Sequence, residues 1–284
     1  MSSNFKLDQT LPWKSQVVGK FLSPAVRLWL RSQLDSVEDL QFKLEGGDRQ
    51  FLSGCIARVS VAARQLVYQG LQLSHIQLVG ENIQVNLGQI LCGKPLRLLD
   101  AFPVRGEVLI QEMDLNASVQ ASLLATAVKE GLIGWLQSVE WSGKAAVAAM
   151  LPETMSASKR SYASARLQNL LQSNTENLTV ANLSVVIGSG WLKVSGWLVP
   201  AQRSTGWEAV AIAIRTELHL FSERELQLVR PQLLAHPQAT SGEPLQLLDG
   251  AKIDLGPDVS LQALELYPGK LVCRGSITVM PSLN

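Results

Sequence analysis

The chain has 284 residues, of which 46% are hydrophobic and 17% charged, and its formal net charge is +1. This length suits one large β-rich domain or two ordinary ones. The nearly neutral charge gives no support for nucleic-acid binding. Because no run of about 18 uncharged apolar residues is present, we expect no membrane-spanning helix.

The cysteines and the N-terminus predict a cytoplasmic protein and are compatible with peripheral association with a membrane. Cys55, Cys92 and Cys273 are far apart and odd in number, which argues against a disulfide framework and favours a reducing compartment. The first residues lack a basic start followed by an apolar core, because charged residues and a proline interrupt them. We therefore expect no secretion signal.

The N-terminal region contains one predicted helix, which follows an arm formed by residues 1–22. Ser23 and Pro24 are typical of a helix start, since serine caps the first turn and proline is tolerated there. We expect the helix over residues 23–35, with its apolar side chains on one face. Two interpretations remain open: the helix packs on a sheet, or the segment lies on an anionic membrane surface. The candidate surface residues are Lys14, Lys20, Arg27 and Arg31.

Several strands are expected next, because apolar and polar residues alternate. Gly46 and Gly47 predict a tight turn between the first two strands. Within 71–87 the apolar positions switch from odd to even and back, which predicts two strands with bulges or a turn at Gly80-Glu81-Asn82. The expected strands are 37–44, 51–61, 71–87, 94–99 and 104–113.

A long apolar helix is expected over 114–137, capped by Asp114 or Asn116. Its apolar residues cover almost every side. A helix of this kind is either buried or lines an apolar groove. The stripe that we expect to face the sheet includes Val119, Leu123, Ala127 and Leu132.

The second half of the chain begins with an Ala- and Ser-rich connector over 138–176. Strands are expected after it at 178–187, 191–199, 207–220, 259–266 and 270–280. Glycines at 188–190 and the Tyr-Pro-Gly at 267–269 predict hairpin turns. The resulting organisation is an arm over 1–22, a helix-strand-helix region over 23–137, the connector, and strands over 177–281 that complete the same β-rich domain.

No motif for catalysis, metal binding or cofactor binding is convincing. The stretch 88–95 nearly matches a phosphate-binding loop, but Pro95 stands where a Ser or Thr should bind magnesium, and a strand is expected after it. The three histidines are far apart. Glu107 and Glu112 are expected on opposite strand faces, and Asp114 is explained as a helix cap. We therefore expect no enzyme activity and no cofactor.

Several segments together resemble the LmeA-like phospholipid-binding family, in its cyanobacterial branch. They are the LSPAVRLWLRSQL at 22–34, the VEDL at 37–40, the GGDRQ at 46–50 with the LSG at 52–54, the YQGL at 68–71, the GKPL at 93–96 and the DLNAS at 114–118. The resemblance implies an α+β fold like that of the tubular lipid-binding proteins, in which a strongly curved antiparallel β-sheet wraps a long apolar helix. It also implies phospholipid binding rather than catalysis.

Two functional hypotheses follow. In the first, the protein binds and carries phospholipid or another long apolar molecule in a groove between helix and sheet, at a membrane surface. In the alternative, it is a protein-interaction module whose core is filled by its own side chains. The groove candidates under the first hypothesis are Trp29, Leu30, Val119, Leu123, Ala127 and Leu132.

Overall fold

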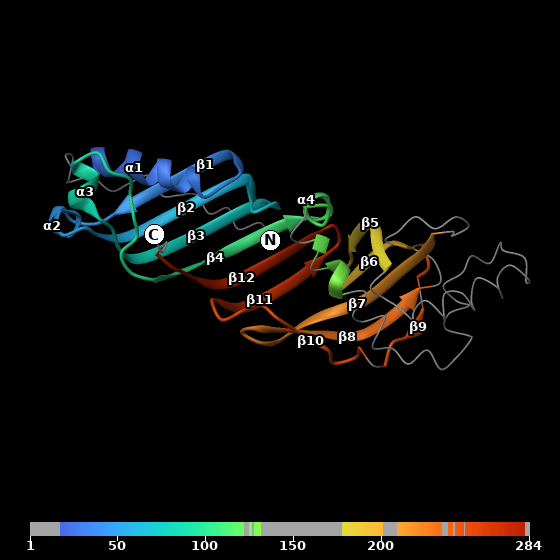
Figure 1. Cartoon of the computed structure of the whole chain (residues 1–284). Coiled ribbons are helices and arrows are strands. Elements are labelled where there is room, and N and C mark those ends of the chain that lie inside the picture. The colour runs from blue at the N-terminus through green and yellow to red at the C-terminus, as the bar shows by residue number, and fades with distance from the viewer. Residues whose placement is uncertain are drawn as a thin grey trace, which may run out of the picture.

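The computed structural model describes residues 18–121, 125–126, 128–131, 178–200, 209–234, 238–240, 242–246 and 248–281. These residues form two antiparallel sheets, which follow one another along an elongated molecule (Figure 1). The first sheet has the order β1-β2-β3-β4-β12-β11, so the C-terminal hairpin completes a sheet that the N-terminal half begins. The second has the order β10-β8-β7-β6-β5, with β9 paired to β8. An α+β, β-rich fold is therefore confirmed.

Most of the expected strands are present, some with shifted ends, whereas β8, β9 and β10 were not expected from the sequence. The first sheet contains β1 (Ser36–Glu45), β2 (Cys55–Tyr68), β3 (Leu71–Gln84), β4 (Phe102–Gln111), β11 (Val259–Tyr267) and β12 (Lys270–Val279). The second contains β5 (Leu178–Ile187), β6 (Trp191–Pro200), β7 (Val210–Ser222), β8 (Glu225–Leu234), β9 (Glu243–Pro244) and β10 (Lys252–Asp254). Both predicted hairpins are present, β5–β6 and β11–β12.

Three helices, α1 (Val18–Ser32), α2 (Asp48–Leu52) and α3 (Leu87–Leu91), gather at the outer end of the first sheet (Figure 1). The predicted start of α1 at Ser23 is wrong, because Ser23 and Pro24 lie inside the helix. The apolar face of α1 extends further towards the N-terminus than expected: Leu22 is almost completely buried against the sheet. Burial of that side chain stabilises the first turns despite the proline.

Two further predictions at this end of the sheet are wrong. Gly46 and Gly47 lead into the short helix α2 and not into a tight hairpin. Residues 94–99 form no strand of a sheet and contribute one isolated bridge, between Val85 and Leu98, after α3. At 48–52 the residues form a helical turn whose Phe51 packs into the core, and at 94–99 Leu96 and Leu98 pack on the same cluster from the connection after α3. A short apolar run alone does not distinguish a strand from another buried segment such as a short helix.

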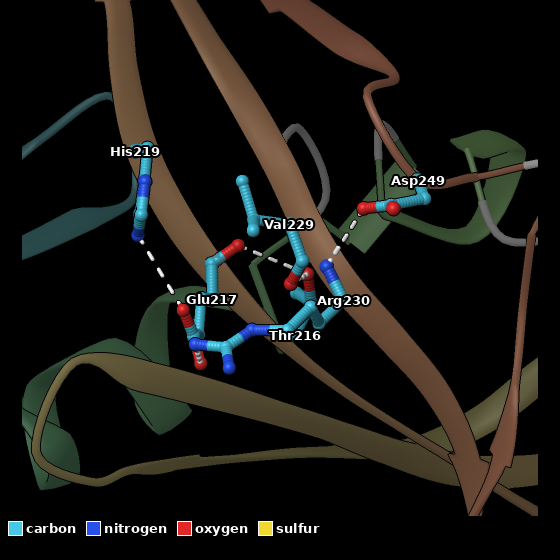
Figure 2. Close-up of polar contacts among 6 residues, drawn as sticks. All are labelled: Thr216, Glu217, His219, Val229, Arg230 and Asp249. Atoms are coloured by element: carbon cyan, nitrogen blue, oxygen red, sulfur yellow. Dashed lines mark hydrogen bonds and ion pairs between the residues drawn. The ribbon is translucent and has the colours of Figure 1, made fainter.

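A left-handed residue explains one of the predicted changes of phase, and another forms a bulge in β8. Strand β3 is continuous, so the expected division of 71–87 into two strands is wrong; Asn82 has φ 54° at the point where the apolar positions change from even to odd. Arg230 of β8 has φ 50° and lies in a bulge opposite β7. Figure 2 shows how this bulge is held: the Arg230 N–H donates to Asp249 Oδ1 (2.8 Å), and its guanidinium pairs with Glu217. Bulges of this kind bend and twist the strand.

The long apolar helix predicted over 114–137 is not shown. Helix α4 (Glu112–Ser118) ends at Ser118, and residues 119–121 form a turn before helical residues resume at Ala125. The hydroxyl of Ser118 donates to Asp114 O (2.7 Å) and accepts from the Gln72 N–H of β3 (2.8 Å). The last residue of α4 is thereby joined to the first sheet.

Helix α4 joins the two sheets through polar side chains. Asn116 exchanges two hydrogen bonds with the backbone of Val185 on the edge strand β5 (2.7 and 2.8 Å), and Glu112 accepts from the Ile187 N–H (2.7 Å). On the side facing the first sheet, buried Asp114 accepts from the Ser74 hydroxyl (2.5 Å). Asp114 is thus not the helix cap that we expected. The polar residues of the DLNAS segment connect the sheets.

Candidate lipid-binding site

One face of the first sheet is apolar over three neighbouring rows of residues. The registers align its residues in three rows that run across all six strands, and no row contains a charged or hydrogen-bonding side chain other than a thiol. The rows, from β1 to β11, are Leu44-Val59-Gly80-Val104-Ile277-Val259, Phe42-Val61-Leu78-Gly106-Gly275-Leu261 and Leu40-Ala63-Ile76-Val108-Cys273-Leu264.

This face is covered unevenly. Leu22 and Val26 of α1 pack on it at the β1 side, in a cluster that includes Leu44 and Val59. On β1, β2 and β3, five of the nine row positions are buried. On β4, β12 and β11, none of the nine is buried, and Ile277 is 45% exposed. We call these nine positions the open half: Val104, Gly106, Val108, Gly275, Cys273, Ile277, Val259, Leu261 and Leu264.

Two glycines face each other in the middle row of the open half. Gly106 of β4 pairs with Gly275 of β12. A Cβ added to Gly106 would lie 2.0 Å from Gln77 O, and one added to Gly275 would lie 2.3 Å from Ser260 O. The neighbouring strands therefore come too close for any side chain, which explains glycine at both positions.

The one titratable group of the open half stays uncharged at neutral pH. Burial raises the pKa of the Cys273 thiol from 9.0 to about 11, so the thiolate forms only in strongly alkaline solution. Cys273 behaves here as a small apolar residue. A surface without charge favours apolar ligands, because no buried charge has to lose its water shell when a chain covers it.

The opposite face of the same strands is polar. Arg274 of β12 contacts Glu107 of β4 (2.6 Å) and Glu265 of β11 (3.2 Å). The hydrogen bond from Tyr267, assisted by Arg274, lowers the pKa of Glu265, and the hydrogen bond to Glu107 raises the pKa of Arg274. These ion pairs are solvent-exposed and contribute little to stability. Their position distinguishes a water-facing side of the sheet from the apolar side.

The predicted groove residues fall into separate places. Trp29 and Leu30 are half-buried against the cluster below α1. Val119 is buried in another cluster, formed mainly by the second sheet. The structure therefore does not bring Val119 together with Trp29 and Leu30. Leu123, Ala127 and Leu132 lie outside the described residues.

The predicted membrane-surface residues are only partly described. Arg27 and Arg31 are exposed on α1, and Arg27 lies 5.4 Å from the centroid of the Phe42 ring. Lys20 belongs to α1, but its side chain lies outside what the structure describes, as does all of Lys14. These four residues remain predictions.

Sequence reasoning did not identify the open half as a site. A signal was present in the predicted strand 270–280, because Cys273 and Ile277 alternate with polar residues. Leu261 and Leu264 share a face only because of the bulge between 261 and 263. The alternation does not reveal that β12 pairs with β4, because these strands are more than 150 residues apart in the sequence. Without that pairing the nine positions cannot be recognised as one surface.

The described residues offer little for metal-dependent chemistry. Within them, no group of three or more His, Cys, Asp or Glu side chains is placed to hold a metal ion. Glu217 forms ion pairs with Arg230 and His219, and the pair with Arg230 holds the β8 bulge (Figure 2). None of the described helices is both long enough and apolar enough to cross a membrane.

The comparison with protein families agrees with an apolar ligand surface. The family model for LmeA-like phospholipid-binding proteins matches residues 14–276. The chain belongs to the LmeA-like phospholipid-binding family. The resemblance to this family is thereby confirmed, and the family is described by phospholipid binding and not by a known enzyme activity. Neither curated proteins nor solved structures give a significant match to the chain.

Proposed function

We propose that this protein is a non-enzymatic binder, and a carrier, of phospholipid, whose acyl chains lie on the open half of the first sheet. The observation that supports this proposal best is the uncharged apolar surface across β4, β12 and β11, none of whose nine positions is buried. Isolated apolar side chains are ordinary on protein surfaces, whereas a contiguous apolar patch is typical of a binding surface.

In this proposal, removal of the lipid acyl chain from water provides the binding energy. Each methylene removed from water contributes about 0.8 kcal/mol. A chain of about a dozen methylenes therefore offsets the loss of translational and conformational freedom on binding. Trp29 and Leu30, on the helix that covers the other half of the same face, are proposed to border the chain. Leu123, Ala127 and Leu132 remain candidates to line it.

The first test is to purify the protein under native conditions, extract it with organic solvent and analyse the extract by mass spectrometry. We expect phospholipid in stoichiometric amount, either directly or after incubation with liposomes. A clean extract in both cases would overturn the proposal and favour the protein-interaction module.

Variants locate the ligand. Leu261→Gln with Ile277→Gln places two polar groups on the open half, and we expect this double variant to lose most of its bound lipid. Ala263→Gln with Thr278→Gln is the matched control, because these residues lie on the same two strands and face the polar side. Both double variants should keep the wild-type circular dichroism spectrum. Equal lipid content in the two would exclude the open half as the site.

A further inference from the structure

The outer end of the first sheet carries large apolar side chains that point into solvent. Leu52 ends α2, Leu91 ends α3, Leu99 precedes β4 and Met280 follows β12, and each is more than half exposed. The connections that hold these leucines are tied together, since the Val85 N–H donates to Gly54 O (2.8 Å) and the Leu99 N–H donates to Gln84 O (2.9 Å). The apolar side chains therefore belong to one end of the molecule.

The same end is positively charged. Segments 18–32, 46–54 and 85–101, which contain α1, α2, α3 and their connections, carry six basic and two acidic residues. The whole chain has a net charge of +1, so the remainder carries three more acidic than basic residues. Within the part of the chain that the structure describes, Arg49, Lys94 and Arg97 are exposed and pair with no carboxylate. One acidic residue, Asp258, lies near this end on the β11 side, where its backbone C=O accepts from the Thr278 N–H.

This end leads directly onto the open half. Val279 of β12 pairs with Phe102 of β4 next to Met280, and the following apolar pair on that face is Ile277 with Val104. Ile277 and Val104 belong to the open half. Val104 and Val279 pack on the same apolar cluster as Phe51 of α2 and Leu87 of α3, so apolar side chains run from the helices at this end to the proposed acyl-chain site.

We propose that the end formed by α1, α2, α3 and their connections docks on an anionic lipid bilayer, with Leu52, Leu91 and Leu99 inserted at the interface. Arg49, Lys94 and Arg97 would contact the lipid phosphates. This inference deepens the proposed function and rests on it, because docking there lets an acyl chain pass from bilayer to sheet without crossing water. Exposed leucines beside unpaired cations fit a bilayer interface, which offers apolar depth and negative charge together.

The test is flotation of the full-length protein with vesicles of phosphatidylcholine alone and of phosphatidylcholine mixed with phosphatidylglycerol. The wild type should float with the mixed vesicles. Combined Leu52→Ser, Leu91→Ser and Leu99→Ser should lower partitioning by at least about tenfold. The matched control changes three other exposed apolar residues, Met113, Phe221 and Ile253, to Ser and should float like the wild type.

A second set of variants tests the charges. Arg49→Gln, Lys94→Gln and Arg97→Gln should each lower partitioning onto the mixed vesicles by about fivefold, and much less onto neutral vesicles. Control changes to Gln at the exposed Arg64, Arg105 and Arg224 should have little effect. The docking proposal would be overturned if the wild type failed to float. It would also be overturned if the control variants lost as much flotation as the corresponding leucine and cation variants.

Uptake of a soluble short-chain phosphatidylcholine separates the two proposals. The leucine variant should take up this lipid normally while failing to float. The Leu261→Gln, Ile277→Gln variant should float and fail to take up the lipid. If flotation is lost in neither variant but uptake is lost in the second, the docking end is wrong and the acyl-chain site stands. Normal uptake by the second variant would reject the site itself.

Discussion

The two sheets are built from similar strands but differ in how they bury them. The apolar residues of the second sheet form a closed cluster, in which Leu198, Ile212 and Leu233 are almost completely buried. The first sheet also has apolar rows, yet their β4-β12-β11 half is only partly covered. Apolar sheet faces therefore have different outcomes in this molecule: the second sheet completes a core, and half of the first sheet leaves a surface that a ligand can cover.

The largest expected effect tests this difference in stability. Leu198→Ala in the second sheet removes a buried side chain and should lower the free energy of unfolding by about 2–5 kcal/mol. Leu264→Ala in the open half should lower it by less, because that side chain is already partly hydrated. Urea denaturation of lipid-free protein measures both. Equal losses would mean that the open half is a core like the other.

A smaller effect is expected at the glycine pair of the open half. Gly106→Ala places a Cβ against Gln77 O and should destabilise the protein by about 1–3 kcal/mol. Gly88→Ala in α3 is the control, because an added Cβ there meets no atom within 4 Å, and alanine favours a helix by about 0.5–1 kcal/mol. Thermal unfolding distinguishes them. A neutral Gly106→Ala would show that β4 and β3 can separate at this point.

The connection between the sheets provides the next comparison. Asn116→Ala leaves the Val185 N–H and C=O without their partners on α4 and should destabilise this contact by about 1–3 kcal/mol. Hydrogen exchange of the Val185 amide should accelerate more than that of amides in β2. Met113→Ala, on the exposed side of α4, is the control and should leave the exchange pattern unchanged.

The smallest effect concerns the thiol of the open half. Because burial raises the pKa of Cys273, the folded state favours the protonated thiol. Its contribution to stability is present below pH 9.0 and is lost as the pH rises through about 11. The difference in unfolding free energy between wild type and Cys273→Ala should therefore shrink over that pH range. A constant difference would show that the thiol is accessible to water.

Thiol modification adds a ligand-sensitive measurement of the same residue. At neutral pH a thiol reagent should modify the exposed Cys92 rapidly and Cys273 slowly. In a Cys92→Ser variant, bound phospholipid should slow the modification of Cys273 further. If Cys273 were fully protected from the reagent in lipid-free protein, another part of the polypeptide would cover the open half.

Local pattern alone predicted most of the strands and both glycine-containing hairpin turns. It succeeded where side chains alternate on a sheet with one apolar face, as in β3 and β12. It also detected the change of phase that Asn82 produces in β3. The family resemblance, carried by segments such as DLNAS, was confirmed by the family match over residues 14–276.

Contacts between distant segments decided the rest. The helical pattern after Asp114 continues in the sequence, but Ser118 bonds to β3 and α4 ends there. Short apolar runs at 48–52 and 87–91 became helices because their side chains reach the core under α1. The open half exists only because β12 pairs with β4, and loop closure over that distance has no local signature. The sequence by itself determined which residues are apolar and how they alternate, and only the tertiary structure decided which of them remain uncovered.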